Sequence, residues 1–248
     1  RATSSLAEAV SNADVVVMAV PSHGYRDVAA EAARHIRPWV PVVSLAKGIE
    51  RESLKRMSEV TADELTGHPV AVLTGPNLAK EVIAGQPAAS VVAIDDETIA
   101  AELARIFSRP TMRIYTNPDV VGCELAGVVK NVIAIAVGIC DGLEMGMNAR
   151  AGLMTRGLNE ITRIGVKLGA KPTTFLGLSG MGDLLLTCTG DLSRNRTVGL
   201  ELGRGRKLDE ILAGMNQVAE GVRTTYAACG LADALGVDVP IMRMIKAI

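Results

Sequence analysis

Lys130 and Asn131 are polar residues inside a long apolar segment, and they are the first candidates for chemistry. A lysine in such a segment must reach solvent with its amine, pair with an acid, or face a cleft. Burial disfavours the ammonium form and lowers the pKa toward neutrality, which suits proton transfer. Lys130 is therefore either an ordinary helix lysine that extends to solvent or a proton-transfer group.

Three further polar positions lie at the predicted starts of helices. Asp183 follows Gly180-Met181-Gly182, where a carboxylate either caps the helix or orients Lys130 or a substrate hydroxyl. Ser193-Arg194-Asn195 combines free backbone N–H groups with an arginine, a combination that binds phosphate but also occurs at ordinary helix starts. Glu220 is either a capping carboxylate or a cofactor contact.

Small and polar residues also follow three predicted strands, at Pro21–Gly24, Lys47-Gly48 and Gly75-Pro76-Asn77. Each stretch alone is typical of a turn. In an open parallel sheet, however, ligands bind beyond the carboxyl ends of the strands. The shared position of the three stretches therefore favours a binding site at this sheet edge.

The elements that must position these residues divide the chain in two. Up to residue 116, short apolar runs alternate with helical patterns, which predicts right-handed βαβ crossovers and a Rossmann-like parallel sheet. The predicted strands are 14–20, 42–46, 70–73, 89–94 and 112–115, and the main predicted helices are 25–36, 52–60, 97–107 and a short one to residue 84 capped by Asn77.

From residue 117 onward the pattern is helical. The predicted helices are 119–142, 148–168, 183–188, 194–202, 208–213, 218–235 and 241 onward. We expect an α/β domain at 1–116 and an all-α substrate domain at 117–248, with a small-molecule site in the cleft between them.

Composition excludes several classes of partner. The 26 basic and 27 acidic side chains nearly cancel, and the aromatic residues are one Trp, three Tyr and two Phe. Nucleic acids and anionic membranes favour a basic surface, and single-stranded nucleic acid also needs aromatic stacking platforms. No uninterrupted apolar run is long enough for a membrane span, so we expect no stable membrane insertion.

The four cysteines and three histidines lack the spacing of a metal site. We predict buried free thiols in a reducing cytoplasm and no metal. The chain also lacks a G-x-G-x-x-G sequence between a strand and a helix. If this is a dinucleotide fold, its first βαβ unit lies before residue 1.

In this order the segments resemble the bacterial form of the NAD(P)-dependent sn-glycerol-3-phosphate dehydrogenase family. The resemblance rests on AVPSHGYRDV (19–28), SLAKGIE (44–50), TGPNLAKEV (74–82), ELAGVVKNVIAIAVGICDGL (124–143), GMGDLLLTCTGDLSRNRTVG (180–199) and QVAEGVRT (217–224). It covers nearly the whole chain. It implies that the family's N-terminal glycine-rich segment and a C-terminal piece lie outside the sequence.

The resemblance implies reversible reduction of dihydroxyacetone phosphate to sn-glycerol 3-phosphate with NADH or NADPH, feeding glycerophospholipid synthesis. Lys130 matches the catalytic lysine that gives a proton to the carbonyl oxygen. Lys47 matches a lysine near both nicotinamide and substrate, where its charge stabilises the developing alkoxide. Asp183 matches a carboxylate that holds the substrate and Lys130 in register.

The remaining matches concern binding. Ser193, Arg194 and Asn195 match the substrate phosphate clamp, with Arg194 also near the cofactor. Further substrate-side positions are Gly75, Asn77, Asn131 and Thr187, and further cofactor-side positions are Ala79, Val218 and Glu220.

The resemblance further suggests a cytoplasmic homodimer, without deciding between NAD and NADP. Two alternatives stay open. One is a related hydroxy-acid dehydrogenase of similar architecture, which would not need the phosphate clamp. The other is a nucleotide-sensing paralogue, or a truncated chain that binds substrate without turnover.

Overall fold

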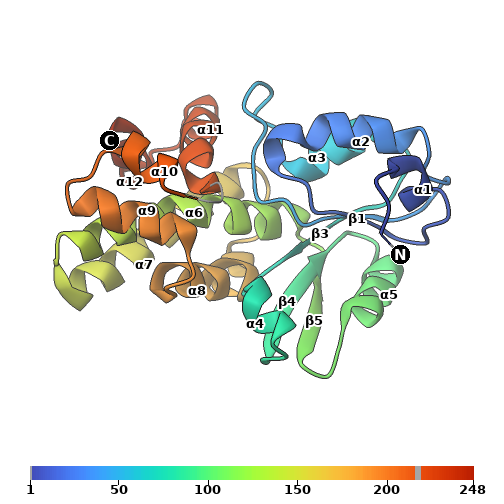
Figure 1. The fold of residues 1–248 in the computed structure, drawn as a ribbon, viewed down its shortest axis with the longest axis horizontal. Coiled ribbons are helices and arrows are strands. Elements are labelled where there is room, and N and C mark those ends of the chain that lie inside the picture. Colours follow the sequence, from blue (N-terminus) through green and yellow to red (C-terminus); the bar gives the residue numbers. More distant parts are fainter. Residues whose placement is uncertain (1, 216–218) are drawn as a thin grey trace.

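A five-stranded sheet and a helical bundle lie next to each other in the computed structural model, which describes residues 2–215 and 219–248. The bundle is built around one long helix whose first turns lie against the sheet (Figure 1). The strands follow chain order in the sheet: β1 (Val16–Met18), β2 (Val42–Ser44), β3 (Val70–Thr74), β4 (Ala88–Ala93) and β5 (Met112–Asn117).

The inner strand β2 is covered on both faces, which explains its apolar run. The predicted burial of 14–20 on both faces is wrong, because Val17 in β1 is 42% exposed. Val42 and Val43 are both fully buried and point to opposite faces of β2. Val42 packs with α1 (Leu6–Val10), α2 (Tyr25–Ala33) and α3 (Met57–Glu64), whereas Val43 belongs to the core under α5 (Glu97–Phe107). The predicted α/β class with a following helical part is confirmed.

The prediction of an all-parallel sheet is wrong at one strand pair, so that β4 and β5 run opposite to the first three strands. β4 runs antiparallel to β3, with Leu73 opposite Val92, while the other three strand pairs are parallel. Residues 75–87 are long enough for a parallel crossover, but they contain only the five-residue helix α4 (Ala79–Ile83), whereas such a crossover usually holds a longer helix that packs on the sheet. The chain therefore turns back.

Two local predictions also fail. The predicted helix 52–60 starts instead at Met57, because Leu54 adopts a left-handed backbone conformation and Glu50 N–H donates to the carbonyl of Lys55 in a turn. Asn77 does not cap α4. Leu78 is the N-cap residue, and the Asn77 amide donates to Ser90 Oγ at 3.0 Å.

The helical half is organised around α6 (Val120–Gly142), which is buried on nearly all sides. Asp119 caps it by accepting a hydrogen bond from Gly122 N–H, and its second oxygen accepts the N–H of Lys171 from a distant part of the chain. Around it pack α7 (Gly146–Lys167), α8 (Asp183–Thr189), α9 (Arg194–Gly203), α11 (Glu220–Ala234) and α12 (Pro240–Ala247), and α10 (Leu208–Ala213) packs on α9.

The length and apolar character of α6 bear on the prediction that the chain does not insert into a membrane. In the described part of the chain, α6 alone is long and apolar enough to cross a membrane, but 89% of the relevant window is buried by the rest of the protein. This is the environment of a core helix.

The predicted domain boundary between residues 116 and 117 stays a prediction. β5 ends at Asn117 and α6 begins at Val120.

A buried ion pair fixes α6 to the sheet half. The Glu124 side chain is 1% exposed and lies 2.8 Å from Arg56 Nη1 at the start of α3. The same carboxylate accepts the Ser58 backbone N–H and contacts the Ser58 hydroxyl. Arg56 also contacts Glu59, whose side chain is 46% exposed. Arg56 therefore pairs with one buried and one exposed carboxylate, and removing the charge of each in turn compares what the two ion pairs contribute to stability.

We expect Glu124→Gln to lower the free energy of unfolding by roughly 3 kcal/mol, because it leaves Arg56 facing a neutral amide in a buried site. Glu59→Gln should change it by less than about 1 kcal/mol, since that pair is screened by solvent. Urea unfolding of the two variants tests this. Equal, small effects would show that the buried pair does not hold the two halves together.

Candidate active site

Lys130 lies in the middle of α6 and is only 4% exposed. Its amine is 2.5 Å from Asp183 Oδ1 and donates a hydrogen bond to Thr187 Oγ1 at 2.6 Å. Both partners are on α8, and Thr187 in turn donates to the Asp183 carbonyl. The sequence left open whether Lys130 extends to solvent. In the structure it does not: its amine is buried and pairs with an acid.

Asp183 also binds a second amine, which comes from the sheet half. Lys47 follows β2, and its Nζ lies 2.9 Å from Asp183 Oδ2. Asp183 is 1% exposed, so a fully buried carboxylate is held between two ammonium groups. The residue at the start of α8 thus does more than cap a helix, since each of its oxygens faces a different lysine.

The pKa of Lys130 is lowered to about 7. Burial is the main cause, because it removes the hydration of the charged form, and the nearby Lys47 ammonium acts in the same direction. Asp183 opposes both effects. An amine with a pKa near neutrality can both give and accept a proton under ordinary conditions.

A cleft with two arms opens onto these amines. The larger cavity, of about 450 Å³, runs along the ends of β1 and β2 and the start of α4, at Ala19–Pro21, Leu45–Lys47 and Asn77–Ala79. The smaller cavity, of about 150 Å³, is lined by Asn131 and by Leu192–Asn195. Both are lined by Lys47, Leu78, Lys130, Thr187, Arg194 and Glu220.

The smaller arm ends at the N-terminus of α9. The Ser193 hydroxyl caps this helix by accepting the Arg196 N–H, and Arg194 is the first helical residue. The Asn195 side-chain oxygen accepts the Gly221 N–H at 2.9 Å and thereby joins α9 to the first turn of α11. A helix N-terminus with an arginine at its mouth attracts an anion.

This architecture and cleft can be compared with known proteins. The family model described as the NAD-dependent glycerol-3-phosphate dehydrogenase N-terminus matches residues 1–100, and the model of its C-terminus matches residues 119–248. The chain belongs to this family. The resemblance stated from the sequence motifs is thereby confirmed.

Individual relatives agree. A glycerol-3-phosphate dehydrogenase (NAD(P)+) of Sphingopyxis alaskensis is 61% identical over 98% of this chain and 73% of its own length. One of Mycobacterium avium is 50% identical over the whole chain and 73% of its own length. The crystal structure of glycerol-3-phosphate dehydrogenase from Coxiella burnetii superposes with a TM-score of 0.95 at 36% identity, covering 99% of this chain and 75% of that one.

Most of the site residues that the sequence predicts line the two-armed cleft. Within the described residues, those that line one arm or both are Lys47, Asn77, Ala79, Lys130, Asn131, Asp183, Thr187, Ser193, Arg194, Asn195 and Glu220. Gly75 does not line either arm. It has φ +133°, and an added Cβ would lie 3.1 Å from Ser90 Cα, so it shapes the turn after β3. Val218 lies outside the described residues.

Glu220 is the first residue of α11 and lines both arms. Burial raises its pKa, while Arg194 and Lys47 act in the opposite direction. Leu78 and Leu192 also line the cleft and were not predicted. Apolar residues in a turn give no chemical signal, although Leu78 stands between two predicted contacts, Asn77 and Ala79.

The described residues contain no group of three or more His, Cys, Asp or Glu side chains that could hold a metal ion. Cys123, Cys140, Cys188 and Cys229 are buried free thiols, as predicted. Burial raises the pKa of Cys123 to about 11 and that of Cys188 to about 12, so neither forms a thiolate at neutral pH.

We expect the Lys130 amine to titrate near pH 7, and its pKa to rise in Lys47→Met because the neighbouring ammonium is removed. Asp183→Asn should lower the pKa further, since the opposing carboxylate is lost. NMR titration of lysines labelled at Cε measures both shifts, with the exposed Lys80→Met as control. A Lys130 pKa that stays near 10 in every variant would contradict the electrostatic account.

Proposed function

We propose that this chain catalyses the reversible reduction of dihydroxyacetone phosphate to sn-glycerol 3-phosphate with NADH or NADPH. The observation that carries this function is the buried lysine of pKa about 7, held by Asp183 at the junction of a nucleotide-type sheet and an anion-binding arm. The family match supports the same reaction.

The larger arm suits the nicotinamide end of the cofactor. It lies beyond the carboxyl ends of β1 and β2, and its walls at Ala19, Ala46 and Ala79 are small side chains that leave room for a flat ring. Lys47, Ala79, Arg194 and Glu220 would hold the cofactor there. When bound, NAD(P)H supplies the hydride, and the protein supplies orientation and charge.

In the direction of reduction, protonated Lys130 donates its proton to the carbonyl oxygen of the substrate, and in the reverse direction the neutral amine takes the proton back. Lys47 keeps a second positive charge beside the oxygen as it becomes an alkoxide. Asp183 holds both amines in place through its two oxygens. Thr187 accepts a hydrogen bond from Lys130 and so directs the amine toward the cleft.

The phosphate group of the substrate would occupy the smaller arm. Arg194 and the first backbone N–H groups of α9 supply positive charge, and Asn195 and Asn131 add amide groups. This arm favours a phosphorylated triose over an unphosphorylated hydroxy acid. The lysine pair in its low-dielectric site favours an enzyme over a sensor that only binds nucleotide.

We further propose a cytoplasmic homodimer without membrane insertion. The four free thiols are consistent with a reducing compartment. An apolar groove of about 590 Å³ between α6, α7 and α12, with Leu143, Met145 and Met244 exposed, supports an interface there.

Lys130→Met should lower kcat for dihydroxyacetone phosphate reduction by about 10³-fold, because the proton donor is lost. In the unaltered protein, the reduction rate should fall as the pH rises through about 7, where the required ammonium loses its proton. The oxidation rate should rise over the same range, since oxidation needs the neutral amine. Steady-state kinetics in both directions measures this.

The circular dichroism spectrum of Lys130→Met serves as the check that its fold is intact. Turnover that survives in this variant, or a reduction rate that rises through pH 7, would remove the proton-transfer role.

Arg194→Ala should lower kcat/KM for dihydroxyacetone phosphate by about 10²-fold or more, because a partly desolvated phosphate loses its charged partner. The loss for unphosphorylated dihydroxyacetone should be several-fold at most. Arg204→Ala, at an exposed position in the same segment, is the matched control. Equal losses for the two substrates would contradict a phosphate clamp.

A further inference from the structure

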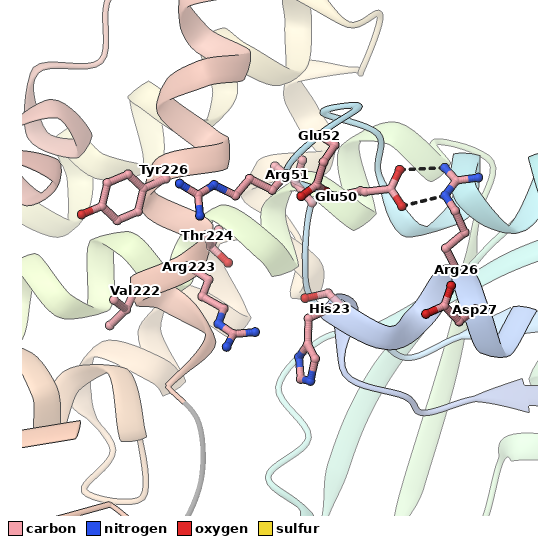
Figure 2. Close-up of a pocket in the computed structure, with 12 residues that line it drawn as sticks. His23, Arg26, Asp27, Glu50, Arg51, Glu52, Val222, Arg223, Thr224 and Tyr226 are labelled. Carbon is pink, nitrogen blue, oxygen red and sulfur yellow. Dashed lines mark hydrogen bonds and ion pairs between the residues drawn. The ribbon is translucent and has the colours of Figure 1, made fainter. Parts of the chain in front are cut away.

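A separate cavity of about 520 Å³ lies between the two halves of the molecule. Figure 2 shows its walls, which are the start of α2, the loop after β2, and the first turns of α11. It shares no lining residue with either arm of the catalytic cleft. Its size is within the range of pockets that hold small molecules.

Two arginines on one side of this cavity have no acidic partner. Arg51 lies over the Tyr226 ring, with 5.7 Å between its guanidinium carbon and the ring centroid. Neither Arg51 nor Arg223 makes an ion pair or hydrogen bond with any other residue that the structure describes. Stacking on a ring leaves the N–H edges of a guanidinium available, which suits the recognition of phosphate.

Thr224 supplies a hydroxyl group that is open to the cavity, between these arginines. The residue is 4% exposed and lines the cavity, and its side chain has no hydrogen-bond partner in the described part of the chain. In Figure 2 its oxygen lies between the guanidinium groups of Arg51 and Arg223. An oxygen of a bound ligand would give this hydroxyl a hydrogen-bond partner.

The side of the cavity toward the sheet carries both acidic and basic side chains. Glu50 is occupied by Arg26, which donates to both carboxylate oxygens at 2.7 Å. Asp27 and Glu52 have no partner among the described residues. Carboxylates in this position accept hydrogen bonds from hydroxyl groups. The cavity therefore has a cationic end, on the α11 side, and an end that favours hydroxyls.

We propose that this cavity is a second binding site, for a phosphate monoester of a polyhydroxy compound. The phosphate contacts Arg51, Arg223 and the Thr224 hydroxyl, and the hydroxyls of the ligand face Asp27 and Glu52. Such a ligand joins the two halves of the protein, because Arg51 is on the loop that carries Lys47 and Arg223 is one helical turn from Glu220.

The test is isothermal titration calorimetry with D-glucose 6-phosphate, glucose and inorganic phosphate. We expect D-glucose 6-phosphate to bind with one equivalent, inorganic phosphate to bind more weakly, and glucose not to bind. Arg51→Ala and Arg223→Ala should each weaken binding by about tenfold or more, as expected for lost hydrogen bonds to a charged group. Thr224→Val should weaken it several-fold.

The controls separate this site from the catalytic cleft. Arg204→Ala should bind as the unaltered protein does, and so should Lys130→Met and Arg194→Ala. Absence of binding at 10 mM ligand, or equal affinity of the Arg51 and Arg223 variants and the unaltered protein, would overturn the proposal. Loss of binding in Arg194→Ala would place the ligand in the catalytic cleft and would also overturn it.

Discussion

The structure depends on one buried carboxylate that binds two amines from different halves of the chain. Asp183 faces Lys130 with one oxygen and Lys47 with the other. When Lys130 is protonated, two ammonium groups surround one carboxylate, and the cluster carries an excess positive charge in a place that is poor in water. Such an arrangement is unfavourable when isolated. It becomes useful when a substrate oxygen is about to gain negative charge between the same amines.

The low pKa of Lys130 requires that the two lysines are held at a fixed separation by rigid elements from the two halves of the chain. Lys130 is in the centre of α6, a helix that is buried on nearly all sides. Lys47 is at the end of β2, in a sheet that is packed on both faces. The Glu124–Arg56 pair ties α6 to α3 and therefore limits how far the two supports can shift. A small displacement would change the separation of the amines and, with it, the pKa of Lys130.

The junction of the two halves provides more than one binding surface. The catalytic cleft uses Lys47 and Glu220 from the two sides, and the second cavity uses Arg51 and Arg223 from the same two segments. The two cavities differ in their polar character. The catalytic cleft concentrates positive charge around a reacting oxygen, whereas the second cavity has two arginines toward α11 and both acidic and basic side chains toward the sheet.

Several features of this protein follow from the sequence alone. The apolar run at 42–46 predicts a buried strand because a strand covered on both faces carries no polar alternation, and β2 is buried throughout. The run at 14–20 gives the same prediction, but Val17 in β1 is exposed. The polar Lys130-Asn131 pair within a buried helix marks the site, since a lysine has few ways to be tolerated there. The motif order from AVPSHGYRDV to QVAEGVRT identifies the family.

Tertiary structure alone decided the rest. The reversal of β4 accompanies a connection that holds only a five-residue helix, and the start of α3 depends on a left-handed turn at Leu54. The Asn77 amide donates a hydrogen bond to Ser90 on β4, and Asp183 contacts both lysines. These contacts join residues from different elements of the fold. Sequence periodicity reports which face of an element is apolar, but a pKa is set by distances between groups, and those distances exist only after folding.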